Sequence, residues 1–409
     1  MNKNCILSKL SEIAVVTQGQ SPESRYYSNS EGTPFLQGNR TFGNLYPSFD
    51  VYTNKVTKLA RVGDVLMSVR APVGALNFAP CDLCIGRGLA SIRAKNNNNR
   101  FIYYALKYNI RNLIKQGKAT TFDSVNKDTI NNFQLIIPSE ESVQNSVSNL
   151  LTKIDNKIEI NNKINSELEN LAKTIYDYWF VQFDFPDDNG KPYKSSGGEM
   201  VWNEELKKEI PKGWKVQNLV ENSLTALVKP GIKEFKNTKT YLATSEVQET
   251  NINLNAPKIT FTNRESRANM QPISNSVWFA KMKNSKKILY FGKYSDKLLD
   301  ELILSTGFAG LNCIEDYYLE YILNVINNDN FEISKDLLSN GATQQAINNE
   351  SMKFIPLLVP SENVLKEFHK QTYNSYMKIY LNTIESHELA ELRDFLLPLL
   401  MNGQVTIND

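Results

Sequence analysis

The first third of the chain is rich in amide, hydroxyl and guanidinium side chains that stand close to glycines. Such groups donate and accept hydrogen bonds at the edges of DNA bases, and basic or amide groups also fix the phosphates. Gly-flanked segments are typical of loops, from which a rigid scaffold can present these groups. The candidate contacts in this part are Gln18, Gln20, Arg25, Gln37, Asn39, Arg40, Arg70, Arg87, Lys118, Thr120 and Thr121.

Arg70 and Arg87 are the leading candidates in this set, because an arginine can bind a base edge through two parallel hydrogen bonds. The alternative is that either arginine makes an internal ion pair. Tyr26, Tyr27 and Tyr46 could stack on a base or pack inside the protein, and the sequence does not choose between these roles.

A second group of candidate contacts lies after residue 212 and is rich in lysine. The alternative for this lysine cluster is an ordinary solvated loop. The candidates are Lys229, Lys233, Thr244, Lys281, Lys283, Lys286, Lys287, Thr343 and Gln344.

Catalytic motifs are missing from the sequence. It has no Pro-Pro dipeptide, which excludes the Asn/Asp-Pro-Pro-aromatic loop of an adenine methyltransferase, and no Gly-x-x-x-x-Gly-Lys-Ser/Thr phosphate loop. His369 and His387 are expected to be solvated helix residues, and Cys81 and Cys84 to be packing residues, because a structural zinc site needs four ligands. We therefore expect a non-catalytic chain with no metal and no cofactor.

Charge is distributed unevenly along the chain. Residues 1–138 hold 17 Lys and Arg against 8 Asp and Glu, a net of +9, whereas residues 212–360 hold 17 against 15, a net of +2. The stretches 139–180, 181–211 and 361–409 each carry 4 against 7, a net of −3. A basic first region suits a polyanionic partner. No run of about 18 apolar residues is present, so no membrane span is expected, and the cytoplasm is the default compartment.

The two halves of the chain repeat one another in the same order. Residues 133–140, FQLIIPSE, resemble residues 355–362, IPLLVPSE: each is a short apolar strand, a proline and a serine suited to a helix N-cap. Upstream, residues 85–90, IGRGLA, parallel residues 304–309, LSTGFA. A repeat in conserved order predicts two domains of similar fold.

A long heptad pattern follows each repeat. Lys157 and Asn161 have counterparts 221 positions later in Lys378 and Asn382, and polar residues at matched positions of a seam are typical of a register-setting device. A helix over residues 140–180 would be roughly 60 Å long and could not bury its apolar stripe alone, so the two helices should pack antiparallel. Pro398 should end or kink the second helix near Gly403.

These patterns predict an α+β protein with two pseudo-repeated domains of mostly antiparallel sheet, separated by two long antiparallel coiled-coil helices. The expected parts are residues 1–138 for the first domain, 139–183 for the first helix, 184–211 for a Pro- and Gly-rich linker, 212–360 for the second domain and 361–409 for the second helix.

Several motifs closely resemble the specificity subunits of type I restriction-modification systems. They are residues 63–74, GDVLMSVRAPVG; 85–90, IGRGLA; 210–214, IPKGW; and 396–403, LLPLLMNG. The resemblance implies that each domain reads one half of a bipartite double-stranded DNA site. It also implies that the helices set the spacing and dock two methyltransferase subunits, with restriction (translocase-nuclease) subunits as possible further partners. Residues 275–287 match residues 63–74 poorly, so the second domain should read a different half-site.

Two other functions stay open at this point. One is a coiled-coil scaffold with no DNA role, and the other is a fragment of a single-chain DNA methyltransferase or nuclease. The missing motifs weigh against the second, and substitution of Arg70 and Arg87 would separate the first from a DNA reader.

Overall fold

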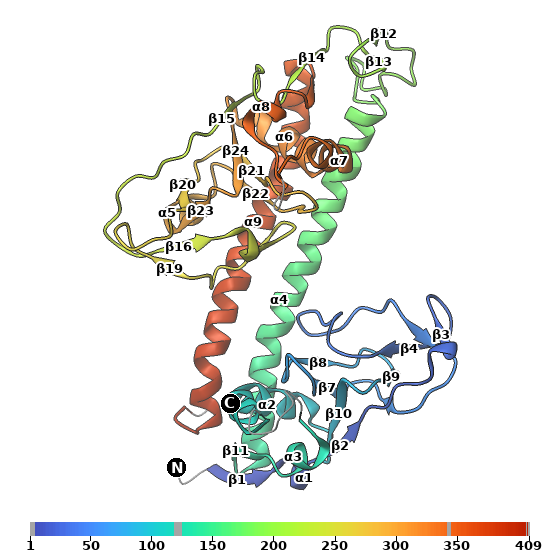
Figure 1. Ribbon diagram of the computed structural model, residues 1–409, viewed down its shortest axis with the longest axis vertical. Helices are drawn as coiled ribbons and strands as arrows, with labels where there is room; N and C mark the ends of the chain where they lie inside the picture. Colours follow the sequence, from blue (N-terminus) through green and yellow to red (C-terminus); the bar gives the residue numbers. More distant parts are fainter. Residues whose placement is uncertain (1–4, 118–124, 342–344, 406, 408–409) are drawn as a thin grey trace. The chain divides into compact units, whose positions relative to one another are not determined.

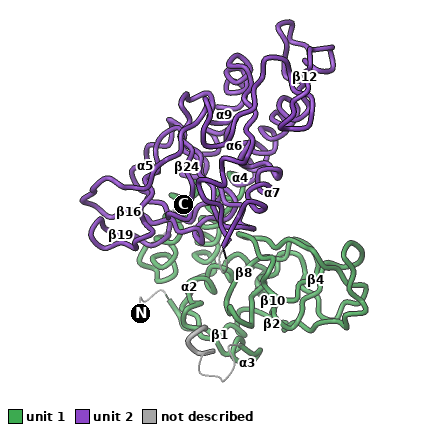
Figure 2. The backbone as a smooth tube through the Cα atoms, turned by 45° about the horizontal axis from the view of Figure 1, so that its top comes forward, with its two compact units in different colours: residues 1–161, 385–409 green, residues 162–384 purple. Residues whose placement is uncertain are grey.

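The computed structural model describes residues 5–117, 125–341, 345–405 and 407. The candidates Lys118, Thr120, Thr121, Thr343 and Gln344 lie outside these residues. The chain forms two compact units: unit 1 is residues 1–161 with 385–409, and unit 2 is residues 162–384 (Figure 2). Each unit therefore contains one set of sheets together with a part of both long helices.

Unit 1 is built on a four-stranded antiparallel sheet in the order β2-β10-β7-β8. A second sheet, β3-β5-β4-β9-β6, contains one parallel pair, β4 with β9, and β1 pairs with β11. The strands are β1 Cys5–Lys9, β2 Ala14–Gln18, β3 Tyr27–Ser28, β4 Thr33–Leu36, β5 Tyr52–Thr53, β6 Leu59–Ala60, β7 Val65–Ser68, β8 Leu76–Phe78, β9 Leu83–Ile85, β10 Leu89–Ala94 and β11 Gln134–Pro138. The helices are α1 Leu10–Ile13, η1 Ser24–Tyr26, α2 Asn99–Gly117 and α3 Lys127–Asn131.

Unit 2 repeats this plan. Its four-stranded antiparallel sheet has the order β15-β24-β21-β22, its second sheet β19-β16-β23-β20 again contains one parallel pair, β16 with β23, and β14 pairs with β25. The strands are β14 Lys215–Asn218, β15 Thr225–Leu227, β16 Lys239–Leu242, β17 Val247–Gln248, β18 Asn251–Ile252, β19 Lys258–Ile259, β20 Ala268–Met270, β21 Ser276–Ala280, β22 Ile288–Phe291, β23 Leu302–Ser305, β24 Phe308–Cys313 and β25 Pro356–Val359. The helices are η3 Thr244–Glu246, α5 Asp296–Glu301, η4 Asp316–Tyr318, α6 Leu319–Asn327, α7 Asp329–Leu337 and α8 Asn349–Met352, and the hairpin β12 Met200–Asn203 with β13 Lys208–Pro211 precedes them.

The matching strand orders confirm the predicted repeat. β7 and β10 place Ser68 opposite Leu89, and β21 and β24 place Ala280 opposite Phe308. Because Leu89 and Phe308 hold the same place in the repeated motif, positions of the two units can be matched residue by residue.

Two long helices complete the chain (Figure 1): α4 Glu141–Tyr176, continued by one π-helical stretch over Asp177–Val181 (η2), and α9 Glu362–Met401. Helix α9 runs through Pro398 and ends before Gly403. Within unit 1, Arg393 donates to Asp155 at 2.7 Å and Asn161 donates to Glu385 at 2.8 Å. Positions that ascend along α4 therefore meet positions that descend along α9, and the predicted antiparallel pairing is confirmed.

The same pairing holds inside unit 2. Asn382 donates to the side-chain oxygen of Asn165 at 2.9 Å, and Asn165 approaches Thr383. Asn161 and Asn382, the matched polar positions of the heptad seam, are both fully buried. No helix among the described residues is long and apolar enough to cross a membrane.

Candidate nucleic-acid interface

Four segments of unit 1 converge next to the start of β10. The N–H groups of Gly86 and Gly88 donate to the carbonyls of Leu36 and Gln37, that of Gly19 donates to Leu89, and that of Gln20 donates to Ile85. These bonds join the ends of β2, β4 and β9 to the turn before β10. The loops that carry most of the candidate contacts of the first third therefore meet at one place.

The glycines of this turn are needed for close approach. A β-carbon on Gly88 would lie 2.5 Å from the carbonyl oxygen of Gln37, and one on Gly86 would lie 2.9 Å from the α-carbon of Gln37. Neither backbone atom can move away as the end of a flexible side chain could. The motif of residues 85–90 is therefore explained by packing at its glycines, while Arg87 between them is exposed.

Arg70 and Arg87 lie on adjacent segments, because the N–H of Val69 donates to the carbonyl of Gly88 at 2.9 Å. Both arginines are exposed. Within the described part of the chain, neither guanidinium group has an ion pair or hydrogen bond. The internal ion pair that the sequence left open is thus not seen among the described residues, and both side chains are exposed.

Hydrogen bonds of a buried serine stabilise the turn that carries Arg70. The Ser68 hydroxyl donates to the carbonyl of Pro72 at 2.6 Å and accepts from the N–H of Ala75 at 2.9 Å, and Ser68 itself is buried. The Ala71–Pro72 peptide bond is cis, and Gly74 has a positive φ of 91°. Ser68 is thus a positioning residue for this turn.

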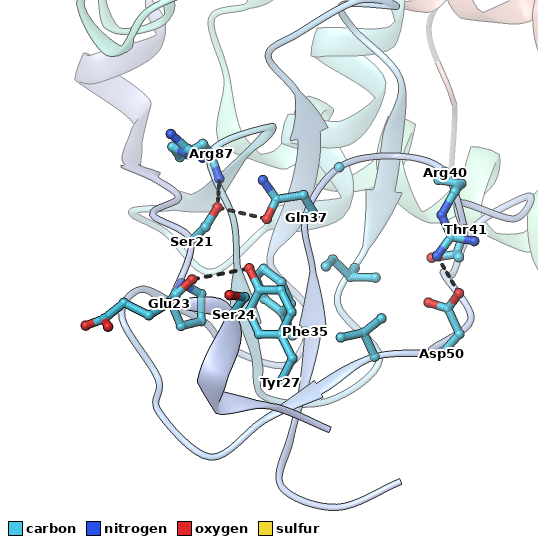
Figure 3. Close-up of a pocket in the computed structure, with 14 residues that line it drawn as sticks. Ser21, Glu23, Ser24, Tyr27, Phe35, Gln37, Arg40, Thr41, Asp50 and Arg87 are labelled. Atoms are coloured by element: carbon cyan, nitrogen blue, oxygen red, sulfur yellow. Dashed lines mark hydrogen bonds and ion pairs between the residues drawn. The ribbon is translucent and has the colours of Figure 1, made fainter. Parts of the chain in front are cut away.

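Beside this convergence lies a pocket of about 630 Å³, lined in part by Ser21, Gln37, Arg40 and Arg87 (Figure 3). The Ser21 hydroxyl donates to the Gln37 side-chain oxygen at 2.8 Å and accepts from the backbone N–H of Arg87 at 3.2 Å. These bonds leave the Gln37 amide nitrogen to donate elsewhere. Ser21 was missed by the sequence analysis, because nothing in a lone serine indicates that it joins two distant loops.

Other candidates of the first third are partly engaged within the protein. Arg40 pairs with Asp50, and Arg25 pairs with Glu23 at 3.0 Å, all four being exposed side chains. Exposed pairs of this kind are weak, so DNA phosphates could displace the carboxylates. Gln18 ends β2 half-buried, Asn39 is half-buried, and Gln20 is exposed.

Two stacking candidates, Tyr27 and Tyr46, contact other side chains of unit 1 but are exposed. The Tyr27 ring lies 5.0 Å from that of Phe35, and Tyr46 accepts a hydrogen bond from Arg100 at 2.8 Å. Tyr26 instead has cationic groups over its ring, Arg25 at 5.0 Å and Lys55 at 4.9 Å.

The buried carboxylate of the Gly63–Gly74 motif serves the fold. Asp64 accepts from Arg93 at 2.6 and 2.8 Å, from the Ser91 hydroxyl at 2.6 Å and from the backbone N–H of Arg61 at 2.9 Å. The hydrogen bond to Asp64 raises the pKa of Arg93. This network ties β7 to β10 and explains the motif's Asp without a role in binding.

In unit 2, some of the lysines predicted to contact DNA bind groups within the same unit. Lys286 pairs with Asp329 at 2.9 Å, and Lys287 donates to the carbonyl of Thr244. Lys335 is buried and donates to the carbonyl of Ser285 at 2.9 Å. This hydrogen bond fixes the turn after β21 to helix α7.

The remaining predicted DNA contacts of unit 2 differ in their exposure to solvent. Lys229 and Lys233 are exposed, and Lys281 and Lys283 are half-buried. Thr244 is half-buried in η3.

One expectation about histidine was wrong. His369 is not fully solvated but half-buried, with its side chain 22% exposed, and its Nδ1 lies 2.6 Å from a carboxylate oxygen of Glu320, which is 1% exposed. Burial lowers the pKa of His369, but the hydrogen bond with Glu320 and its charge outweigh this, so the net shift is upward. Burial also raises the pKa of Glu320. The heptad pattern could not reveal this partner because Glu320 lies on α6.

Cys5, Cys84 and Cys313 are buried free thiols, and Cys81 is half-buried. Among the described residues, no group of three or more His, Cys, Asp or Glu side chains could hold a metal ion. Burial raises the pKa of the Cys81 thiol.

Comparison with known proteins bears on this arrangement. Residues 2–170 match the model of the type I restriction modification DNA specificity domain. This part of the chain is similar to that family. The resemblance carried by the sequence motifs is thereby confirmed. The matched range contains both Arg70 and Arg87.

Relatives of the chain point to the same family. It is 40% identical over 163 residues to the putative type I restriction enzyme MjaX specificity subunit of Methanocaldococcus jannaschii, a match that spans 39% of this chain and only 38% of that protein. It is 24% identical over 362 residues to the type I restriction enzyme MjaIX specificity subunit of the same organism, covering 85% of this chain and 78% of that protein.

The fold has a solved counterpart. The crystal structure of the S subunit of a type I restriction-modification system from M. genitalium matches with a TM-score of 0.60 at 15% identity, covering 98% of this chain and 96% of that chain. The predicted fold class is confirmed by this match.

Proposed function

We propose that the chain is the DNA specificity subunit of a type I restriction-modification complex. Each unit reads one half of a bipartite double-stranded DNA target. Helices α4 and α9 set the spacing of the half-sites and dock two methyltransferase subunits, and restriction subunits can join them. The chain itself is non-catalytic in this scheme, and methylation and cleavage belong to its partners.

The observation that carries the proposal is the pair of exposed arginines in unit 1, neither of which has an ion pair or hydrogen bond from its guanidinium group to a residue that the structure describes. Arg70 and Arg87 lie on adjacent segments, and the glycines around Arg87 fix its backbone. An exposed cation held on a rigid scaffold suits a polyanion, and a guanidinium group can also bind guanine in the major groove through two hydrogen bonds.

The main test is to replace Arg70 or Arg87 by alanine in the full chain and map the methylated bases in the source genome. Each substitution should relax one half-site and leave the other unchanged, because a good two-bond contact to a base is worth roughly 1–3 kcal/mol of discrimination. Arg111→Ala is the matched control, since Arg111 is an exposed arginine on α2 that is not among the candidate contacts. If no substitution in either unit alters the methylated sequence, the proposal fails.

A second test addresses the helices. Inserting seven residues after Asn161 in α4 and before Glu385 in α9, where the two units divide, keeps the heptad register. The insertion adds about 10 Å of helix, close to three base pairs of DNA at about 3.4 Å each. The spacer should lengthen by about that amount while both half-sites keep their letters. Changed half-site letters would contradict the division of labour.

A further inference from the structure

Unit 2 lacks both leading arginines of unit 1 at the equivalent positions. The N–H of Val69 donates to Gly88 in unit 1, and the N–H of Lys281 donates to Gly307 in unit 2, each at 2.9 Å. Together with the strand registers, this matches Arg70 to Met282 and Arg87 to Thr306. Two cationic positions of unit 1 are thus neutral in unit 2.

Two other cations stand next to these neutral positions. The carbonyl of Arg267, directly before β20, accepts from the N–H of Thr306 at 2.8 Å, so Arg267 is the backbone neighbour of the residue that replaces Arg87. A β-carbon on Gly307 would lie 3.6 Å from Nη2 of Arg267, which places the guanidinium group over the same turn. Lys281 directly precedes Met282, the residue that replaces Arg70.

Arg267 and Lys281 are close enough to repel each other. Burial lowers the pKa of Lys281, and the charge of Arg267 lowers it further. Arg267 is exposed and Lys281 half-buried, and neither has an ion pair or side-chain hydrogen bond with a residue in the described ranges. Two adjacent like charges without a carboxylate cost folding free energy, which an external anion would recover.

We propose that Arg267 and Lys281 form the DNA-contacting pair of unit 2, with Arg267 as a specificity-determining residue that takes the place of Arg87. Arg267 reads a base edge, because its exposed planar group can make two parallel hydrogen bonds. Lys281 contacts a phosphate, because a half-buried ammonium group is a point charge with short reach. This inference rests on the proposed function and names the reader of its second half-site.

The test is Arg267→Ala in the full chain, again with mapping of methylated bases. Discrimination at one position of the second half-site should fall roughly 10- to 100-fold, with the first half-site unchanged. Arg267→Lys keeps the charge but not the paired donors. Its methylation level should therefore exceed that of Arg267→Ala, whereas its discrimination should stay low. Lys258→Ala, an exposed lysine on β19 in the same unit, is the matched control and should behave as wild type.

Lys281→Ala has a different signature. The affinity of the full chain for its target should fall for all sequences alike, and the slope of log affinity against log salt should decrease by about 1. If Arg267→Ala leaves the second half-site unchanged while Arg87→Ala alters the first, this inference is overturned and the proposed function stands. If both leave the methylated sequence unchanged, this inference is overturned and so is the assignment of Arg87 as a reader.

Discussion

The two units share a strand order and a turn glycine, yet they differ in the charges around that glycine. Gly88 and Gly307 accept the same backbone hydrogen bond, from Val69 and Lys281 respectively. In unit 1 the neighbouring cations are Arg70 and Arg87, whereas in unit 2 they come from other positions. The two units thus keep the same backbone register around this glycine. The exposed side chains next to it differ between the units, while the fold is the same.

The helix seam shows a second contrast. In unit 1, an ion pair between Arg393 on α9 and Asp155 on α4 joins the two helices. Its side chains are 16% and 3% exposed. In unit 2 a contact of the same seam is neutral, Asn382 with Asn165, and its counterpart in unit 1 by the 221-residue repeat is Asn161 with Ser386. A buried charge requires its partner, whereas a buried amide loses only a hydrogen bond when its partner is removed.

The largest expected effect is therefore in the seam of unit 1. Arg393→Ala leaves the Asp155 carboxylate buried, with the Tyr104 hydroxyl as its remaining donor among the described residues, and should destabilise unit 1 by about 3–5 kcal/mol. Asn382→Ala in unit 2 should cost about 1–3 kcal/mol. Hydrogen exchange followed by mass spectrometry measures each unit separately through its own peptides.

A double substitution checks the cause. Asp155→Ala with Arg393→Ala removes both charges, so its cost should be clearly less than the sum of the two single costs. Additive costs would show that the ion pair is not the reason for the loss.

A smaller effect is expected at the turn glycines. A β-carbon on Gly88 would meet the backbone oxygen of Gln37 at 2.5 Å, whereas one on Gly307 would first meet the Thr244 methyl group at 2.9 Å. Gly88→Ala should therefore destabilise unit 1 by about 1–3 kcal/mol, and Gly307→Ala should cost unit 2 less, because a side chain can rotate away. Hydrogen exchange measures both losses. If Gly88→Ala in unit 1 and Gly307→Ala in unit 2 lose the same amount of protection, contact with the backbone is not the reason for the cost at Gly88.

Much of the architecture could be predicted from the sequence, because it depends on local signals. The Pro-Ser pair after an apolar strand and the heptad spacing after Ser139 indicated the long helices, and the order of motifs indicated the repeat. The site was less accessible. Ser21 acts through Gln37, 16 residues away, and Arg267 reaches Thr306 only because β20 pairs with β23. Such contacts depend on tertiary register, which a single sequence does not display.

The smallest expected effect concerns the two histidines, one in each unit. His369 in unit 2 contacts the buried carboxylate of Glu320 at 2.6 Å, whereas His387 in unit 1 lies 3.4 Å from the exposed carboxylate of Glu391. An ion pair with an exposed group contributes little, so the coupling of protonation to stability is expected at His369.

The direction of that coupling follows from the raised pKa of His369. The folded state binds the His369 proton more tightly than the unfolded chain, so the stabilisation is complete below the ordinary pKa of 6.5 and is lost as the pH rises through the raised value. The raised pKa of Glu320 acts in the same direction at lower pH. Of the other charges that face His369, Asp316 reinforces the shift and Lys293 opposes it.

All four tryptophans of the chain lie in unit 2, so urea unfolding followed by tryptophan fluorescence reports on that unit. As the pH rises from about 6 through the raised pKa of His369, the free energy of unfolding should fall in the wild type. His369→Gln can still donate a hydrogen bond to Glu320 but carries no charge, so its curve should be flatter over this range. His387→Gln is the matched control and should follow the wild type. If His369→Gln keeps the full wild-type slope, another group is responsible, and the contrast between the two histidines is not the one that their partners suggest.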